Sequence, residues 1–298
     1  MQHRFTSTLA LEAAYVGKVG GHLFLSLNRN QAIPGPGDYN PRRPFYQLYG
    51  LTQGIYQTCN CDNSNYNALQ AKLQKQFSRG LDFLLTYTWS KALGNSEGAG
   101  VFSDNYNVRG SYGPLPWDRT HVVTLQHNWD LPFGRNRHWT LGNNLVADTI
   151  LGGWRLSGTH TFSSGLPLTP SVSSAPLLNT DFNNVRADIV GDPSVPNPSA
   201  SLWFNPAAFT EPQQPYRNGT AGRNSLRGPA LYLSNFSLSK DLIPSERWML
   251  ELRADALNAF NHVNLGLPSS TIDVSGAGQI TSVQTAMRQM QFGLHLRF

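Results

Sequence analysis

The sequence has few charged residues and no long apolar run. Asp, Glu, Lys and Arg make up 14% of its 298 residues, well below the roughly 25% typical of soluble globular domains. No stretch approaches the ~18 consecutive apolar residues that a transmembrane helix needs, which excludes a helical membrane protein. A membrane-spanning β-strand needs only about 9 to 11 residues and alternates its two faces, so a β-barrel is compatible with this composition.

The sequence also lacks the patterns of nucleic-acid binding and catalysis. The net charge is +5, but the basic residues are scattered and form no run. A G-x-S-x-G nucleophile elbow and glycine-rich phosphate loops are both absent. The eight histidines are dispersed, and His121 and His127, which share a strand face, are roughly 20 Å apart along it. We therefore expect no enzyme, cofactor, bound metal or nucleic-acid partner.

Cysteine is scarce. The only two, Cys59 and Cys61, lie in a segment that we predict to be a loop. Zinc sites normally use two separated pairs of ligands, and this sequence has no second pair. Three alternatives remain: a local disulfide, a bond to a cysteine outside this chain, or two unpaired thiols.

The first residues, MQHRFT, contain no apolar segment followed by a small-residue cleavage site, so they do not form an export signal. An exported barrel needs such a signal. Either the protein is cytoplasmic, or an upstream part that includes the signal lies outside this chain.

The strongest positive signal is strict alternation at residues 290–298. Every even position there is apolar and every odd position is small or polar, which indicates a strand with one apolar face. The apolar positions are Met290, Phe292, Leu294, Leu296 and Phe298.

The same alternation recurs upstream, and the sequence predicts an all-β fold of about eight meandering antiparallel strands. No helical period of comparable length occurs. The predicted strands are Leu9 to Tyr15, Leu69 to Phe77, Leu81 to Trp89, His121 to Leu131, Trp154 to Phe162, Tyr232 to Leu238, Trp248 to Ala256 and Met290 to Phe298.

The connections differ in length in a regular way. Residues 76–81 and 241–247 are short turns, whereas the long segments are rich in Gly, Pro, Asn and Ser. Short turns at one end and long loops at the other are typical of outer-membrane barrels, with the short side in the periplasm. If the last strand runs inward, all four long segments fall outside. These segments are 18–63, 92–118, 166–230 and 262–287.

Charged side chains are expected on the polar faces of the strands. Glu251, Arg253 and Asp255 alternate on one face, and with Arg155 and Lys72 they are candidate lumen-facing residues. They form either a charge ladder that contacts a plug or a solvated pore lining. Arginines in the predicted outer loops are candidates for contact with anionic lipopolysaccharide or ligand. These are Arg42, Arg43, Arg109, Arg217, Arg223 and Arg227.

Several short segments together resemble one known family. In order along the chain, they are similar to the barrel of Oar-like TonB-dependent receptors found in Acidobacteria-type genomes. The segments are 64–70 (SNYNALQ), 77–81 (FSRGL), 87–91 (YTWSK), 118–121 (DRTH), 131–134 (LPFG), 152–154 (GGW), 204–209 (FNPAAF), 222–224 (GRN) and 260–262 (FNH).

This resemblance implies a 22-stranded outer-membrane barrel with an N-terminal plug, which takes up a scarce ligand with energy passed through TonB. Residues 1–298 then form the C-terminal part of the barrel, without the plug and the TonB-contacting segment. The alternating face of 290–298 becomes an assembly signal for the outer-membrane insertion machinery. Two alternatives are a structural or adhesive barrel without active uptake and a soluble secreted β-sandwich.

Overall fold

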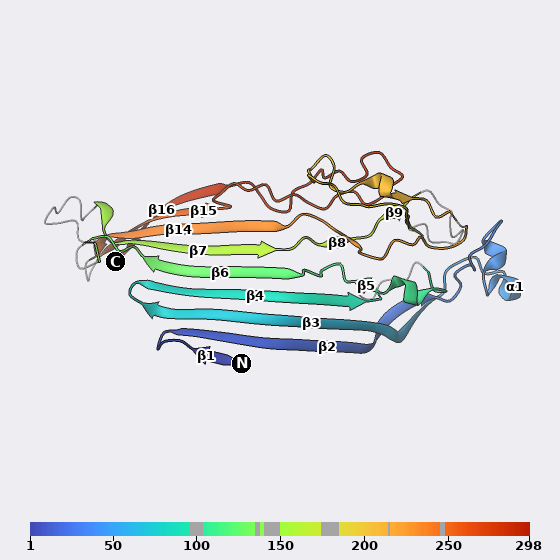
Figure 1. Cartoon of the computed structure of the whole chain (residues 1–298), viewed down its shortest axis with the longest axis horizontal. Coiled ribbons are helices and arrows are strands. Elements are labelled where there is room, and N and C mark those ends of the chain that lie inside the picture. Colours follow the sequence, from blue (N-terminus) through green and yellow to red (C-terminus); the bar gives the residue numbers. More distant parts are fainter. Residues whose placement is uncertain (96–103, 135–137, 140–149, 174–184, 214, 245–247) are drawn as a thin grey trace.

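The chain forms one large antiparallel sheet that carries long loops at one end (Figure 1). The computed structural model describes all residues except 96–103, 135–137, 140–149, 174–184, 214 and 245–247. Ten strands make up the sheet, in the order β1, β2, β3, β4, β6, β7, β14, β15 and β16, with β5 beside β4. Their bounds are β1 (Gln2–Arg4), β2 (Leu9–Asn28), β3 (Tyr56–Ser78), β4 (Leu81–Gly94), β5 (Gly113–Pro114), β6 (His121–Asp130), β7 (Trp154–Ser163), β14 (Leu231–Pro244), β15 (Met249–Leu257) and β16 (Gln289–Arg297).

The predicted fold class is confirmed. All eight predicted strands are present, each pairs antiparallel with its neighbour along the chain, and the sheet is a meander. The short connections lie together at one end and the long ones at the other (Figure 1). Between β3 and β4 the chain turns in two residues, Arg79 and Gly80, with φ of 52° and 79°. Two positive φ values are characteristic of a type I′ hairpin turn.

The predicted loop at 18–63 is wrong over much of its length. β2 and β3 continue far into it and form a hairpin of 20 and 23 residues. At about 3.4 Å per residue, β3 is roughly 75 Å long. The alternation fades because glycines interrupt β2 and because the register shifts between Gly20 and Leu23. His22 has a φ of 57° at this irregularity.

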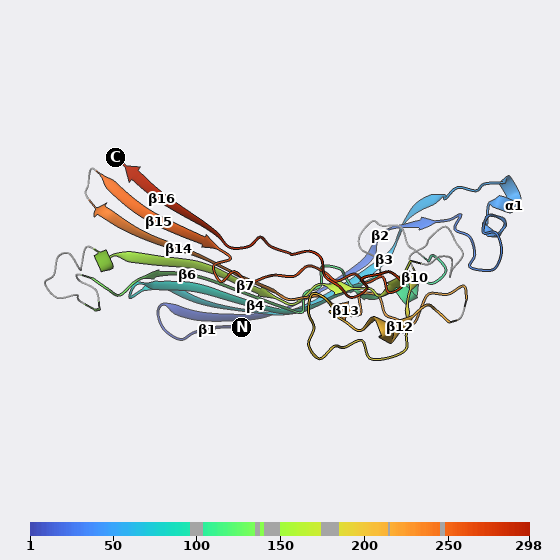
Figure 2. The same ribbon diagram turned by 90° about the horizontal axis from the view of Figure 1, so that it is seen from above.

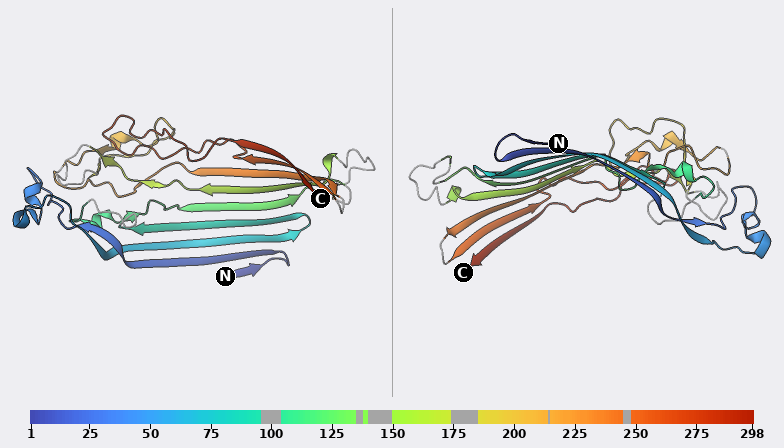
Figure 3. Two further views of the ribbon diagram at one scale, coloured as in Figure 1. Left: turned by 180° about the vertical axis from the view of Figure 1, so that it is seen from behind. Right: turned by 90° about the horizontal axis from the view of Figure 1, so that it is seen from below.

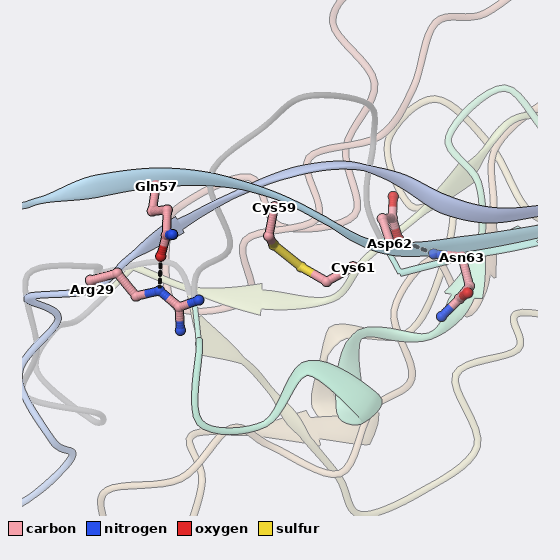
Figure 4. The surroundings of a disulfide bond; sticks show 6 residues. All are labelled: Arg29, Gln57, Cys59, Cys61, Asp62 and Asn63. Carbon is pink, nitrogen blue, oxygen red and sulfur yellow. Dashed lines mark hydrogen bonds between the residues drawn. A yellow bond between two sulfur atoms is a disulfide. The ribbon is translucent and has the colours of Figure 1, made fainter.

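The outer part of this hairpin extends beyond the rest of the sheet as an arm (Figures 2 and 3). Cys59 and Cys61 lie in strand β3 of the arm and not in a loop, and they form a disulfide with each other (Figure 4). A local disulfide was one of the alternatives left open by the sequence. Nearby, Arg29 donates from Nε to Oε1 of Gln57 at 2.6 Å.

The tip of the arm contains the 3-10 helix η1 (Asn40–Arg42) and the one-turn helix α1 (Tyr46–Tyr49). Asn30 is fully buried beneath them, and its Nδ2 donates to the carbonyl of Gln53 at 2.7 Å. Arg43 donates from Nη1 to the carbonyl of Asn30 at 2.7 Å. In the described part of the chain, no helix is long and apolar enough to span a membrane.

The described residues of 164–230 and 262–288 form a second packed region, which we call the loop cap. Three small two-stranded sheets stabilise it, together with the 3-10 helix η3 (Pro206–Ala208). The cap lies at the loop end of the sheet (Figure 2). Its sheets pair β8 (Pro167–Leu168) with β13 (Leu226–Arg227), β9 (Ser171–Val172) with β10 (Val185–Arg186), and β11 (Asp188–Ile189) with β12 (Phe209–Thr210).

The cap has a small hydrophobic core of its own. Phe204 and Phe209 meet edge to face with their ring centroids 5.9 Å apart. Half-buried Trp203 packs against this core. The buried members are Leu168, Val172, Ala187, Phe204, Ala208, Phe209 and Ala221.

The main sheet is curved and does not close on itself. β1 and β16 are at opposite ends of the strand order, and they lie on opposite edges in both views (Figures 1 and 2). The view from below shows the curvature between them (Figure 3).

Candidate functional site

The strand register collects the apolar side chains of the sheet on a single face. Residues directly opposite each other in an antiparallel pair point to the same side. Leu73 faces Leu85, Leu85 faces Leu125, and Leu252 faces Leu294. The same register links all neighbouring strands of the meander, so the apolar positions predicted from alternation form one continuous surface, the apolar band.

Exposure shows that this band is an outer surface of the chain. On β16, Phe292 is 72% exposed and Leu294 is 63% exposed. Contiguous apolar surface of this kind is rare on soluble proteins, and a sandwich would bury it against a second sheet. No second sheet covers it among the described strands.

Aromatic residues mark both ends of the band. On β7, Trp154 and Phe162 are eight positions apart, which corresponds to about 27 Å along a strand. The ring of Phe162 lies 4.9 Å from that of Tyr232, and Trp248 lies 5.8 Å from Phe298 at the opposite end. This spacing fits an apolar band of about 25 Å with aromatic girdles at its two borders.

The cation Lys240 lies at the turn-end border of the band. Its side chain is held in place, because Nζ donates to the carbonyl of Gly152 at 2.5 Å and lies 5.4 Å from the centre of the Trp154 ring. Only 6% of the residue is exposed. The ammonium group is thus neither in the middle of the band nor without hydrogen-bond acceptors.

Two histidines that the sequence analysis treated as dispersed are in fact together on this band. His127 and His160 stack across β6 and β7 with their ring centroids 5.3 Å apart, and Nδ1 of His160 lies 3.0 Å from Oγ of Ser234. The sequence could not show this, because the contact depends on the register between two strands. Within the described residues, no three His, Cys, Asp or Glu side chains are grouped to hold a metal.

The opposite face of the sheet is polar and hollowed. A hollow of about 660 Å³ lies across β6, β7, β14, β15 and β16, lined by residues such as Gln126, Thr159 and Arg253. On this face Arg253 donates from Nε to Oδ2 of Asp255 at 2.9 Å. Charged and amide side chains therefore line this hollow.

The five candidate lumen-facing residues share this polar face but do not form one cluster. Arg155 forms an ion pair at 3.0 Å with Asp130 on β6, whereas Lys72 faces Glu12 on β2 in a separate hollow of about 450 Å³. Glu251 and Arg253 are on β15. Whether this face lines a lumen stays a prediction, as does the assembly role of the apolar positions of β16.

The loop cap is joined to the rim of the sheet by an ion pair that we call the rim latch, Asp118 with Arg227. The carboxylate of Asp118 also accepts the backbone N–H of Ala92 at 2.5 Å. Arg227 donates from Nη1 to the carbonyl of Asp118 at 2.8 Å, and its own carbonyl accepts Nε1 of Trp203 at 2.7 Å. The latch thus connects the end of β4, the segment just before β6 and the cap core.

A second ion pair lies inside the cap. Arg217 donates to both carboxylate oxygens of Asp188, at 2.9 and 2.7 Å, and the backbone N–H groups of Gln213 and Thr220 donate to the same carboxylate. The Arg217 guanidinium, with these two N–H groups, holds the pKa of Asp188 well below its ordinary value of 3.8 against the opposing effect of burial.

Because its folded-state pKa is lowered, Asp188 stabilises the cap above pH 3.8, and this contribution is lost as pH falls through the lower, folded-state pKa. We expect Asp188→Asn to reduce the free energy of opening of the cap by about 1–3 kcal/mol at pH 7. The difference from the wild type should shrink below pH 4. Hydrogen–deuterium exchange of residues 185–221, corrected for intrinsic exchange rates, measures this difference in the free energy of opening. Asp192→Asn is the control, since among the described residues the carboxylate of exposed Asp192 is bonded by Ser194 of its own loop. A pH-independent difference for Asp188→Asn would contradict the assignment.

The arginines predicted to meet lipopolysaccharide or ligand are mostly engaged within the chain. Arg217 and Arg227 pair with carboxylates, and Arg223 donates to the carbonyls of Gly94 and Ser111, each at 3.1 Å. Their contact with an outside partner stays a prediction. The sequence did not indicate the ion pairs of Asp118, noted only as part of the segment 118–121, or of Asp188, because no local pattern shows which arginine a loop carboxylate will meet.

Comparison with known proteins identifies the family. Residues 1–291 match the model of the family described as outer membrane beta barrel domain. None of the curated proteins matches the sequence. Among solved structures, the outer membrane transporter YddB from Escherichia coli is similar, with 11% sequence identity, a TM-score of 0.48 and coverage of 99% of this chain. The chain spans 31% of the length of that transporter. Because the family model covers nearly all of its residues, the chain belongs to the outer membrane beta barrel domain family and is a protein of the outer membrane.

Proposed function

We propose that this chain is the C-terminal part of the wall of a TonB-dependent receptor, which captures a ligand with its loops and imports it across the outer membrane. The observation that carries the proposal is the pairing of an exposed apolar band with a hollowed polar face on a sheet that is still open. The apolar band contacts lipid, and the polar face lines a wide lumen.

The open edges support a wall that further strands complete. In lipid, every backbone N–H and C=O must be bonded within the protein, so an edge strand there is costly. β1 and β16 each have one neighbour among the described strands. Additional strands between them close the barrel and widen its lumen beyond that of a small barrel filled by its own side chains.

The loops give the proposed orientation. Long loops are extracellular and short turns periplasmic in barrels of this kind, so the loop cap and the β2–β3 arm stand outside the cell. There they can meet a ligand and lipopolysaccharide. The insertion machinery meets the apolar face of β16 during assembly.

TonB coupling is supported by the resemblance of the short segments to Oar-like receptors, and three of these segments make defined contacts in the structure. Asp118 is in the rim latch, and residues 204–209 lie in and beside the cap core. Asn261 accepts the backbone N–H of Arg288 at 3.0 Å and ties the two ends of the last long loop. Segments 118–121 and 260–262 thus lie where strands of the wall meet the long loops, and 204–209 lies within the cap.

A crosslinking experiment tests the proposal in the intact gene product. A photoactivatable residue at Gln126 on the polar face is expected to crosslink to a plug segment of the same polypeptide. The same residue at Leu125, the adjacent position on the apolar band, is the matched control and should not. The intact protein should also retain the purified periplasmic domain of TonB in a pull-down.

Two results would reject the transport function. If Gln126 gives no intramolecular product and the TonB domain is not retained, the chain belongs to a structural or adhesive barrel without active uptake. If Leu125 gives the plug product and Gln126 does not, the assignment of the two faces is wrong.

A further inference from the structure

Three outer loops meet around a pocket of about 370 Å³ at the base of the loop cap. Ser111 comes from the β4–β6 connection, Thr169 and Arg186 from the β7–β14 connection, and Ser270 from the β15–β16 connection. The volume is in the range of small-molecule sites. A group bound here would touch all three loops at once.

The lining of this pocket is cationic and rich in hydrogen-bond donors. It includes two guanidinium groups, those of Arg186 and Arg223, and the hydroxyl-bearing residues Ser111, Thr169, Ser171 and Ser270. No carboxylate is among the described lining residues. We call it the arginine pocket.

The two arginines differ in their hydrogen bonding. Arg223 is fixed by the carbonyls of Gly94 and Ser111. In the described part of the chain, the Arg186 guanidinium makes no hydrogen bond or ion pair, and its Nε is buried. Burial lowers the pKa of Arg186; Asp104 attracts its charge without an ion pair, and Arg223 repels it.

This arrangement contrasts with the other cap arginines. Arg217 and Arg227 each have a buried carboxylate from the chain itself, Asp188 and Asp118. A buried polar group without a hydrogen bond costs free energy. The Arg186 guanidinium lies beside that of Arg223 in a pocket lined by hydrogen-bond donors. A bound group that accepts hydrogen bonds would therefore remove this cost. Guanidinium forks match the geometry of carboxylate and phosphate groups.

We propose that the arginine pocket binds one oxyanionic group, a phosphate or carboxylate, of a small ligand captured outside the cell. Arg186 donates to the oxyanion, Arg223 adds its charge from a fixed position, and the serine and threonine hydroxyls complete the shell. The biological role as a capture site rests on the proposed receptor function, but the binding itself requires neither plug nor TonB.

Calorimetric titration of the purified intact protein in detergent, with inorganic phosphate and with citrate, tests the proposal. We expect saturable binding of at least one of the two anions. Arg186→Gln should weaken it about tenfold or more, as for loss of a charge-assisted hydrogen bond, and Arg186→Lys should restore it in part. Arg288→Gln removes the same charge from an exposed position of the loop cap and should leave the affinity within about twofold. A circular dichroism spectrum of each variant verifies folding.

The alternatives give different results. Equal losses for Arg186→Gln and Arg288→Gln would indicate diffuse surface attraction and overturn the site. Absence of binding to both anions by the wild type would overturn it as well, whatever the outcome of the TonB pull-down. A separate arm adds purified lipopolysaccharide: if it binds in an Arg186-dependent way while free phosphate and citrate do not, the oxyanion is a lipid phosphate and the small-ligand proposal fails.

Discussion

Replacing Asp118 with alanine is expected to detach the loop cap from the rim of the sheet while leaving the strands paired. Asp118 is 2% exposed, and its carboxylate binds both the Arg227 guanidinium and the backbone N–H of Ala92. The variant leaves both donors without their acceptor. We expect the free energy of opening of the cap to fall by about 3 kcal/mol, a value reduced because Arg227 is partly exposed to water.

Hydrogen–deuterium exchange measures this effect, because the cap amides should exchange much faster while those of β6 and β7 stay protected. Asp118→Asn keeps an acceptor for Ala92 and loses the charge, so an intermediate effect is expected. Asp192→Ala removes a carboxylate from an exposed position in the cap and should have no effect beyond its own loop. Unchanged cap protection in Asp118→Ala would show that the cap core holds the cap in place without the latch.

The strands of the wall were predictable because one physical requirement repeats along them. Each must show apolar side chains to one side and polar side chains to the other, and a period of two carries that information locally. For this reason the bounds of β7 and β15 agree with the prediction to within one residue at each end. The two-residue turn at Arg79 and Gly80 was equally visible, since Gly favours positive φ.

The strands of the arm were not predicted, because the need to separate apolar from polar side chains on two faces ends at the border of the apolar band. Beyond it, both faces of β2 and β3 meet water or loops, so residues such as Asn60, Asp62 and Asn65 carry no alternation although they are paired. Gly20 and the register shift after it break the period further. Backbone hydrogen bonds, and not side-chain pattern, define these strands.

The cap and its sites depend on contacts that no local pattern encodes. Arg227 meets Asp118 across 109 positions of the chain, and the arginine pocket combines Ser111, Arg186 and Ser270 from three loops. The two-residue strands of the cap are too short for a period. A single sequence marks these segments as long polar loops, and only the fold shows which side chains meet.

The second large effect is expected for Leu85→Arg at the centre of β4. Leu85 lies directly between Leu73 of β3 and Leu125 of β6, four positions from Leu81 and four from Trp89. This places it in the middle of the apolar band. An arginine at the bilayer midplane of a β-barrel costs about 2–4 kcal/mol, whereas the cost is small near the interfaces. We expect a loss of this size in the free energy of unfolding, measured by urea titration of the protein in lipid bilayers.

The adjacent residue provides a control with the same chemical change. Leu84 points to the polar face between Gln74 and Gln126, where an arginine remains hydrated. Leu84→Arg should therefore cost less than about 1 kcal/mol. Equal losses in the two variants would mean that neither face meets lipid, and a larger loss for Leu84→Arg would place the lipid on the polar side. Because the two positions differ only in the face of one strand, the sign of the difference decides which side of the sheet is the outside of the barrel.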